Sequence, residues 1–420
     1  MSRLKLTLLF LFTISSAAQA MQILIPMDES QKNHLKSYGI AFWLLKQKQE
    51  VQWLLNYNGG SFMFQYSQEA ERECKVRGVS YKTISDAAAN AIITQIQDPA
   101  ANLNAVKLLN APKIAVYSPK TKQPWDDAVT LVLTYAEIPY DVIFDDEVLS
   151  GKILEYDWLH LHHEDFTGQY GKFYSSYASA PWYQAEVAES EAMAAKHGFG
   201  SNRELKLAVV KKIRDFMLGG GFLFAMCSAT DSYDIAMAAE STDICESMFD
   251  GTPADQNAQT KLNFDNCIAF KDFALNMDPY FYEFSNIDVD PRTRAVSEEN
   301  DLFTLFDYSA KWDLIPSILC QNHTKTIKGF MGQTTAYRSH LVRSDVLVMG
   351  ENALLNEARY LHGEFGKGTW TFFGGHDPED YQHFVGEAPT DLNLHPNSPG
   401  YRLILNNILF PSAQKSKQKT

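Results

Sequence analysis

The stretch GGGFLFAMCSATDSYDIA, residues 219–236, decides the fold that the sequence predicts. Its three glycines end a helix-like segment, FLFAM is a short apolar run typical of a buried strand, and a polar sequence that favours a helix start follows. A strand that turns sharply into a helix places the residue at the bend, Cys227, in a strained conformation. Ala225 and Ala229 are small enough for such a turn. Cys227 is therefore either a nucleophile or a small buried residue.

Apolar runs and helical periodicities alternate on the amino-terminal side of this turn. The expected strands are KIAVYS, YDVIFDD and YDWLHLH, and the expected helices are PWDDAVTLVLTYAEI and RELKLAVVKKIRDFML. Such an alternation is typical of α/β proteins. We therefore expect an α/β fold with a doubly wound, mostly parallel, flavodoxin-like sheet, whose ligand site lies at the carboxyl ends of the strands.

The remaining segments divide the chain. Residues 21–108 alternate strand-like and helix-like patterns, so we expect an N-terminal α/β portion there. Residues 112–410 hold the sheet around the turn, with an irregular insertion at about 241–328, where no regular period is found. The last residues, 411–420, contain several lysines and are expected to form a disordered tail.

The first twenty residues have the pattern of a leader. Residues 1–20 contain the basic residues Arg3 and Lys5 near their start, continue with the apolar run Leu6–Ile14 and end in A-x-A at Ala20. That order is typical of a secretory signal peptide. The apolar run is too short for a stable membrane anchor, and no later segment has about 18 uninterrupted apolar residues. We therefore expect an exported protein without a membrane anchor, with the bacterial periplasm as its first-choice compartment.

Charge and cysteine content exclude some classes of function. The 420-residue chain has a net charge of −14, which argues against a nucleic-acid partner, because tracking phosphates requires clustered Lys and Arg. Its five cysteines include no C-x-x-C spacing, which argues against structural zinc. In an oxidising compartment four cysteines could pair and leave one free, or all five could stay reduced. The sequence does not determine the oligomeric state.

Two segments carry a resemblance to a known family. LGGGFLFAMCSATD, residues 218–231, and GEFGKGTWTFFGGHDPEDY, residues 363–381, resemble the class I glutamine amidotransferase-like fold and, within it, the trehalose-utilisation (ThuA-like) branch. The resemblance extends over roughly residues 112–410. Where amidotransferases of this fold usually have G-x-C-x-G, this chain has A-M-C-S-A.

The resemblance implies a set of catalytic residues. A cysteine nucleophile at the turn, a histidine after the last strand and an acidic residue close behind it fall on Cys227, His376, and either Asp377 or Glu379. His376 would act as general base and then as acid, the carboxylate would orient its imidazole, and the Ser228 N–H would contribute to an oxyanion hole. The first N–H groups of the helix would also favour the thiolate form of the cysteine.

A second group of chemically active residues lies in LHLHHEDFTGQYGKFY, residues 159–174. His160 and His162 share one face of a strand, and His163 and Glu164 follow at its end, where the sheet is expected to place its site. The three histidines could ligate zinc or another divalent ion, with the histidine after the last strand completing the set. The group could also line a polar substrate pocket or have a structural role.

Together these patterns indicate an exported, cysteine-dependent hydrolase or amidotransferase-like protein that acts on a small amide, peptide or sugar derivative. The alternative is a non-catalytic or metal-assisted protein of the same fold that binds carbohydrate or peptide. We expect a small-molecule substrate and no organic cofactor, with a divalent metal as the open alternative. The reactivity of Cys227 separates the two interpretations.

Overall fold

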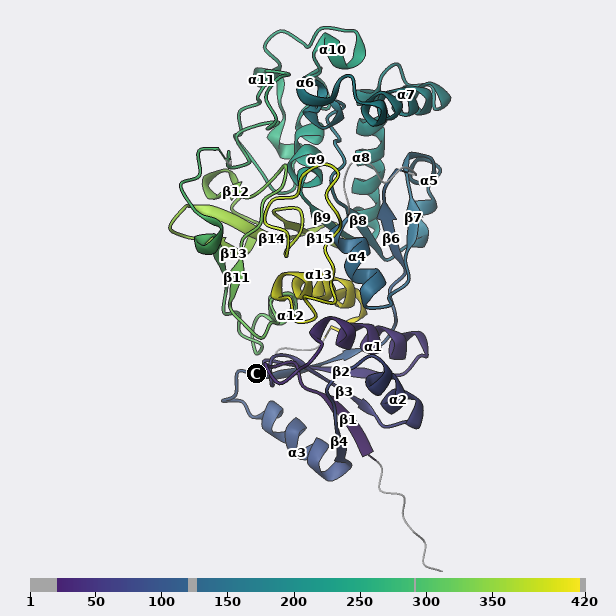
Figure 1. Ribbon diagram of the computed structural model, residues 1–420, viewed down its shortest axis with the longest axis vertical. Coiled ribbons are helices and arrows are strands. Elements are labelled where there is room, and N and C mark those ends of the chain that lie inside the picture. The colour runs from purple at the N-terminus through teal and green to yellow at the C-terminus, as the bar shows by residue number, and fades with distance from the viewer. Residues whose placement is uncertain (1–20, 120–126, 291, 416–420) are drawn as a thin grey trace, which may run out of the picture.

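The computed structural model of the protein describes residues 21–119, 127–290 and 292–415. A smaller unit around one sheet lies at one end of the molecule, and a larger unit around a second sheet forms the rest (Figure 1). The predicted signal peptide, residues 1–20, lies outside the described residues, as does the end of the predicted tail, residues 416–420.

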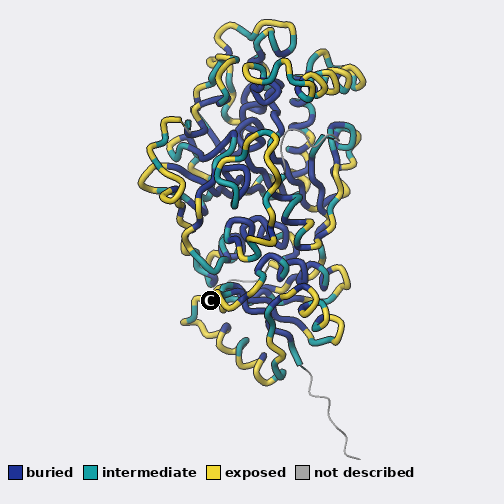
Figure 2. Tube along the Cα trace, viewed as in Figure 1, coloured by how far each residue is buried: buried dark blue, intermediate teal, exposed yellow. Residues whose placement is uncertain are grey.

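The smaller unit is an antiparallel sheet with helices. Its strands are β1 Met21–Ile25, β2 Val51–Leu55, β3 Ser61–Gln65, β4 Lys82–Ser85 and β5 Asn104–Leu108, in the order β4-β1-β3-β2-β5. Its helices are α1 His34–Lys46, α2 Gln68–Val76 and α3 Asp86–Gln97. Each helix begins after a residue, Asn33, Ser67 or Ser85, whose side chain accepts a hydrogen bond from an N–H of the first turn. Figure 2 shows α3 as mostly exposed on the outside of this sheet.

The larger unit contains a ten-stranded sheet. Its strands are β6 Ile114–Tyr117, β7 Asp141–Ile143, β8 Trp158–Leu161, β9 Phe222–Met226, β10 Leu302–Leu305, β11 Thr326–Lys328, β12 Tyr337–Arg338, β13 Leu347–Asn352, β14 Glu357–Phe365 and β15 Gly368–Phe373. The order is β11-β10-β13-β14-β15-β9-β8-β6-β7, and β12 pairs with β14. From β15 to β7 the neighbouring strands are parallel, whereas from β15 to β11 they are antiparallel.

The expectation of a doubly wound, mostly parallel, flavodoxin-like sheet is wrong. The antiparallel pairings include every pair of the smaller sheet and the whole β14 side of the larger one. Connection length explains the difference, because a parallel pair needs a crossover of a dozen or more residues. Gly366 and Lys367 alone connect β14 to β15, so this pair must be antiparallel. The insertion expected at 241–328 adds β10 and β11, which are too short for a periodicity to reveal.

Helices cover both faces of the larger sheet. They are α4 Ala128–Tyr135, α5 Asp145–Leu149, α6 Tyr174–Tyr177, α7 Pro181–Lys196, α8 Asn202–Gly219, α9 Ser228–Ala238, α10 Ser247–Asp250, α11 Ala258–Lys261, α12 Leu314–Leu319 and α13 Pro399–Leu409. Alternate residues of β9 serve the two faces: Phe222 and Phe224 pack in the core with α4 and α13, and Leu223 and Ala225 in the core with α8 and α9. None of the described helices is both long and apolar enough to cross a bilayer.

The two units share one hydrophobic core, which includes apolar residues of α1, α4 and α13. Arg402 of α13 is buried, and its guanidinium donates to the Tyr38 hydroxyl at 3.0 Å and to the Met27 carbonyl at 2.9 Å. It also donates to the carbonyl of Gly59. The last helix thus binds the loops of the first sheet through hydrogen bonds as well as apolar packing.

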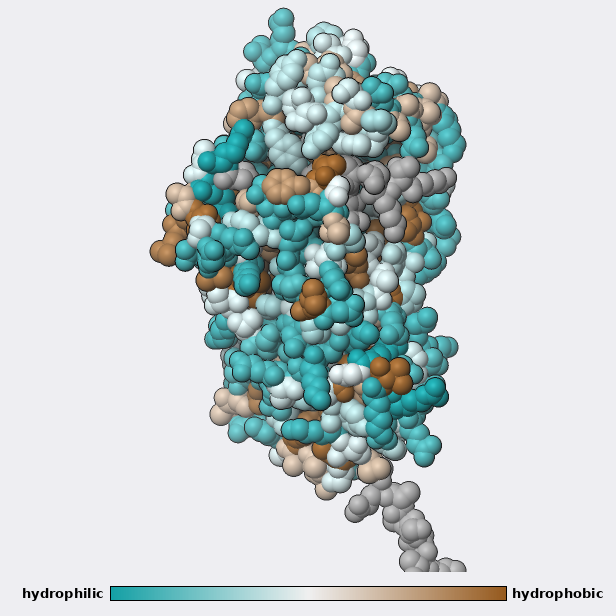
Figure 3. Space-filling model, viewed as in Figure 1, coloured by the Kyte–Doolittle hydropathy of each residue, from teal (hydrophilic) through white to brown (hydrophobic). Residues whose placement is uncertain are grey.

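The chain after α13 returns to the first sheet. Gln414 donates its N–H to the Lys107 carbonyl at 2.8 Å, and Leu109 donates to Ser412 at 3.1 Å. The disordered tail expected from residue 411 is therefore held along β5 up to Gln414. On the face shown in Figure 3, hydrophilic side chains cover most of the surface, and hydrophobic ones form small separate areas.

Candidate active site

Cys227 occupies the bend between β9 and α9. Its φ of 49° and ψ of −141° lie in a region that L-residues other than glycine rarely adopt. Such a residue costs on the order of 1–3 kcal/mol and persists only where its surroundings hold it. Here its N–H donates to the Gly375 carbonyl at 3.2 Å, and the side chain is buried.

Backbone N–H groups surround the sulfur. Gln333 donates its N–H to Cys227 Sγ at 3.3 Å, and the N–H groups of Thr334 and Ser228 also act to lower the pKa of the thiol. Burial outweighs them and raises the pKa of Cys227 to about 11. The low-pKa thiolate that the turn was expected to favour is therefore not what this environment produces, and Cys227 is a thiol at neutral pH.

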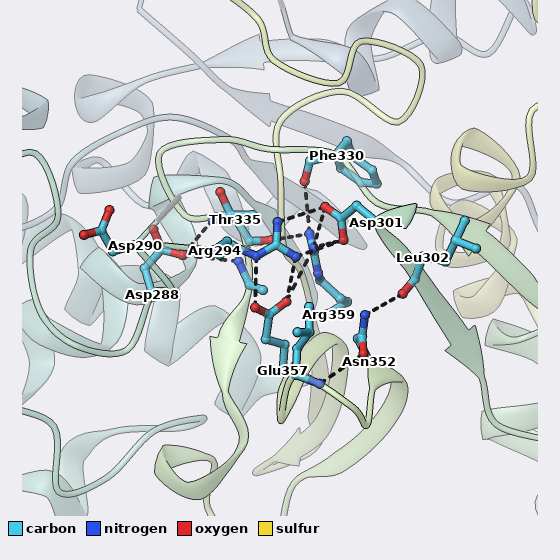
Figure 4. A network of polar contacts seen from close by, with 12 residues as sticks. Asp288, Asp290, Arg294, Asp301, Leu302, Phe330, Thr335, Asn352, Glu357 and Arg359 are labelled. Carbon is cyan, nitrogen blue, oxygen red and sulfur yellow. Dashed lines mark hydrogen bonds and ion pairs between the residues drawn. The ribbon is translucent and has the colours of Figure 1, made fainter. Parts of the chain in front are cut away.

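The loop that carries Gln333, residues 330–335, will be called the thiol loop. Arg359 of β14 holds both of its ends, because its guanidinium donates to the carbonyls of Phe330 and Thr335, each at 3.0 Å (Figure 4). In the middle of the loop, the Thr334 hydroxyl donates to Asp231 Oδ1 at 2.8 Å. The position of the N–H at the sulfur is thus fixed from two directions.

Arg359 belongs to a buried arginine–carboxylate network, formed by Arg294, Asp301, Glu357 and Arg359 (Figure 4). All four carboxylate oxygens of the network accept hydrogen bonds from guanidinium groups, at 2.8–3.0 Å. Bidentate pairs of this kind fix geometry as well as neutralising charge. The network therefore anchors the thiol loop to β14.

His376 follows β15 and Gly374-Gly375, and it lines the same cavity as Cys227. Its N–H donates to the Met331 carbonyl at 2.9 Å, and its Nδ1 lies 3.0 Å from Nε2 of His162. The other ring nitrogen of His162, Nδ1, lies 3.4 Å from Oδ1 of Asp127. Asp127, His162 and His376 thus form a continuous buried row, called here the imidazole series.

The two carboxylates proposed from the sequence to orient His376 have partners of their own. Asp377 accepts hydrogen bonds from the Glu379 N–H at 2.9 Å and from the Thr390 hydroxyl at 2.8 Å. Glu379 pairs with His395 at 3.0 Å. Nδ1 of His376 contacts the imidazole of His162, and the carboxylate at the far end of this row is that of Asp127.

Asp127 is the site residue that sequence reasoning missed. It caps α4, and its Oδ1 accepts from the Thr130 N–H at 2.9 Å. A signal existed in PWDDAVT, because a cap after β6 lies at the same sheet edge as the ends of β8 and β9, which are the next strands in the sheet. The sequence predicted only a helix for this segment.

Buried charges set the protonation of this row. Burial lowers the pKa of His376 well below its usual value, and the neighbouring His162 and His163 act in the same direction. Burial alone would raise the pKa of Asp127, but attraction by His160 and His162 outweighs it, and the pKa stays well below its usual value. The series therefore combines a neutral His376 with an ionised Asp127.

The histidines and the glutamate of residues 159–174 do not all lie in one place. His160 and His162 both approach Asp127, with His160 Nε2 3.1 Å from Oδ2. His163 instead lines the cavity of Cys227, and burial lowers its pKa to about 3. Glu164 accepts the His162 N–H at 3.0 Å, and burial raises its pKa to about 8. Among the described residues, ligand-type atoms of Asp127, His160 and His162 lie within 4.8 Å of one another, whereas His163 lines the cavity.

Two neighbouring cavities open at this sheet edge. The cavity of Cys227 and His376 measures about 330 Å³, and residues from distant segments close it, among them Tyr177, Tyr282 and Gln382. A second cavity of about 370 Å³ is lined by charged residues of the β8–α8 region, such as Glu164, Glu186 and Lys206. His163 and Phe173 line both cavities. These volumes suit a small molecule.

The cysteines do not pair. All five, Cys74, Cys227, Cys245, Cys267 and Cys320, are free, and Cys320 alone is half-buried rather than buried. Of the two alternatives for the cysteines, the structure has the five unpaired thiols.

Neither protein-family models nor curated proteins match this chain. Among solved structures, two cytoplasmic proteins of Salmonella typhimurium each share 10% identity and cover 72% of this chain and 100% of their own, with TM-scores of 0.34 and 0.36. Gan42B, a GH42 beta-galactosidase, shares 11% identity over 64% of this chain and 28% of its own, with a TM-score of 0.26. At such TM-scores these likenesses carry no argument about fold or function.

Proposed function

We propose that the protein is a cysteine-dependent hydrolase or amidotransferase-like enzyme that acts on a small amide, peptide or sugar derivative. The observation that carries this proposal is one cavity lined by both Cys227 and His376, with His376 backed by His162 and Asp127. A thiol, a neutral imidazole and an ionised carboxylate are the parts that nucleophilic cysteine catalysis requires. The strained turn that presents the thiol supports the same conclusion.

The proposed reaction begins with a thiol, because burial holds the pKa of Cys227 near 11. If His376 donates Nδ1–H to His162, its Nε2 is basic and takes the thiol proton while Sγ attacks the carbonyl carbon. The same proton then passes to the leaving amine as the carbon–nitrogen bond breaks, and a thioester remains. Water activated by His376 hydrolyses the thioester and releases the acid and the thiol.

Two features of the chain would assist these steps. The N–H groups of Ser228 and Gln333 lie at the sulfur, where they stabilise negative charge during attack. Asp127 carries negative charge beside His162, so it stabilises the positive charge that the imidazole series acquires when the thiol proton arrives. This is general-base catalysis rather than a resting thiolate–imidazolium pair.

The test is a turnover screen with chromogenic anilides and esters of small acyl groups. Cys227→Ala should abolish turnover of any compound that the native protein hydrolyses, and Cys320→Ala, which removes a thiol outside this cavity, should not. Turnover that survives Cys227→Ala would contradict the proposal. Iodoacetamide labelling of Cys227 should accelerate about tenfold per pH unit between about pH 7 and pH 9, because only the thiolate reacts and the pKa lies above this range.

A non-catalytic binding protein is the second candidate, favoured by one observation. The Cys227 side chain is only 3% exposed, and burial keeps it protonated. In that case no member of the panel is hydrolysed, and compounds protect Cys227 from labelling without being consumed. Saturable protection without turnover would therefore favour this alternative.

Export remains a proposal that rests on residues 1–20 alone. Cleavage after Ala20 would leave β1 complete, because its first residue, Met21, pairs with Ser85 of β4. When the protein is expressed in a bacterium, it should then be recovered in the periplasmic fraction. Amino-terminal sequencing of that protein should give Met21 as its first residue. A chain that begins at Met1 in the cytoplasm would contradict export.

A further inference from the structure

We propose that Asp127, His160 and His162 form a binding site for a divalent transition-metal ion of the zinc class. One carboxylate oxygen and two imidazole nitrogens, all within 4.8 Å of one another, converge behind the Cys227 cavity. His160 Nε2 lies 3.1 Å from Asp127 Oδ2, and His162 Nδ1 lies 3.4 Å from Asp127 Oδ1. Ligand atoms of a tetrahedral zinc ion, with bonds of about 2.0–2.1 Å, are roughly 3.4 Å apart.

The two imidazole nitrogens lack hydrogen bonds. His160 Nε2 and His162 Nδ1 are buried and make no hydrogen bond within the described part of the chain, although both lie close to the carboxylate of Asp127. A buried polar atom without a partner costs about 1–3 kcal/mol, so two beside one carboxylate require an explanation.

The tautomer of His160 sharpens this point. Its Nδ1 lies 3.2 Å from the carbonyl oxygen of Phe224, which accepts hydrogen bonds and cannot donate. A His160 that binds a cation through Nε2 would therefore keep its proton on Nδ1, where this carbonyl accepts it. The 3.1 Å between His160 Nε2 and Asp127 Oδ2 places a carboxylate oxygen where it would stabilise such a cation.

Each of the three side chains is also supported from outside the cluster. The Thr130 N–H donates to Asp127 Oδ1, and His160 Nδ1 contacts the Phe224 carbonyl oxygen. His376 Nδ1 contacts His162 Nε2. Metal-binding histidines almost always use their second nitrogen in this way, because the outer hydrogen bond fixes the ring and its tautomer. A histidine pair with a carboxylate and no thiolate is a ligand set that zinc and its neighbours accept.

An ion here would also regulate the cysteine, a consequence that rests on the proposed function. When His162 Nδ1 binds the ion through its lone pair, the proton of this ring must be on Nε2, which then donates to His376 Nδ1. The proton of a neutral His376 moves to Nε2, and this nitrogen loses its basic lone pair. The loaded protein should therefore be the inactive form, and chelation should activate it.

The test is a Co²⁺ titration of the EDTA-treated full chain, followed by visible absorption. We expect a single equivalent to bind with the absorption bands of a cobalt ion on nitrogen ligands, and Zn²⁺ to displace it. His160→Gln and Asp127→Asn should each weaken binding at least about tenfold, the smaller loss known even for removing a supporting group. His197→Gln removes the surface histidine that pairs with Asp146 at 2.7 Å and should bind as the native protein does.

Each outcome has a definite meaning. Equal binding by the native protein and by both His160→Gln and Asp127→Asn, with native circular dichroism, would overturn the site. Absence of binding in the native protein would do the same and would leave a proton as the cation between His160 and Asp127. Cobalt that binds without slowing a turnover dependent on Cys227 would overturn the regulation alone. His160→Gln keeps the imidazole series, so its turnover should become insensitive to metal.

Discussion

Two buried groups of charged side chains contact the thiol loop, and they differ in how fully they are satisfied. In the arginine–carboxylate network every carboxylate oxygen accepts from a guanidinium group (Figure 4). On the Cys227 side, by contrast, His162 Nδ1 and Asp231 Oδ2 are buried without a hydrogen bond. Among the atoms of the network, Arg359 Nε is the one described as buried without a hydrogen bond, while each charged group faces an opposite charge, as in a structural support. The Cys227 side retains buried polar atoms without hydrogen bonds, as expected of a site that binds a ligand or reacts with one.

The largest expected effect comes from breaking the network. Arg359→Met removes one of the two guanidinium partners of Asp301 and the donor to both ends of the thiol loop. Loss of one member of a buried ion pair costs about 3–5 kcal/mol, and the free energy of unfolding should fall by that amount. Urea denaturation measures it. Lys325→Met, at an exposed pair with Asp307, is the control and should cost at most about 1 kcal/mol.

The next largest effect concerns Asp231, on the Cys227 side of the thiol loop. Burial raises the pKa of Asp231 to about 7, so the folded protein holds this proton more tightly than the unfolded chain. The stability that the proton supplies is complete below about pH 4 and is lost as the pH rises through 7. Asp231→Asn keeps an oxygen for the Thr334 hydroxyl and has no charge. It should therefore be more stable than the native protein by about 2–4 kcal/mol above pH 8.

The control for this prediction is the same pair of proteins at about pH 4, where Asp231 is protonated and the two should unfold at nearly equal urea concentrations. A constant difference at every pH would mean that packing, rather than ionisation, separates them. Either result shows whether the Cys227 side carries an uncompensated charge that the network does not.

The smallest effect concerns the contact between the thiol loop and the proposed catalytic pair, Cys227 and His376. A Cβ on Gly332 would lie 2.9 Å from the His376 backbone nitrogen and 3.1 Å from Cys227 Sγ. Gly332→Ala should therefore cost about 1–3 kcal/mol of stability and change the rate of Cys227 alkylation. Gly219→Ala, where a Cβ meets no atom within 4 Å, is the matched control. An unchanged alkylation rate in Gly332→Ala would show that the thiol loop moves to accommodate the added Cβ without disturbing Cys227, which would contradict this prediction.

Local sequence patterns predicted the parts of the site that depend on neighbours along the chain. FLFAM forms β9, Cys227 stands at the bend, and His160 lies in β8 with His162 directly after it, because short apolar runs and turn residues act locally. Asp127 escaped notice because its partners are distant in sequence, and a cap looks the same whether or not a histidine approaches it.

The sequence did not predict the antiparallel half of the large sheet, for a different reason. Strands such as β10 and β11 have four and three residues, and they pair with each other across a long irregular segment. Alternation of polarity over so few residues does not distinguish a strand from a loop. The β14–β15 hairpin is the exception, because the short Gly366-Lys367 turn between two strand-like runs predicts a hairpin, and the structure confirms it.

The position of α13 has a consequence for the order of events in folding. Arg402 donates to the carbonyl of Met27, a contact between residues 375 positions apart, so the first sheet cannot complete its core until the last helix has been synthesised. Contacts of such long sequence separation slow folding, because the chain must close a large loop before they form. The amino-terminal sheet is thus made first and finished last, and until α13 is made its buried face is covered by its own helices α1 and α2 alone.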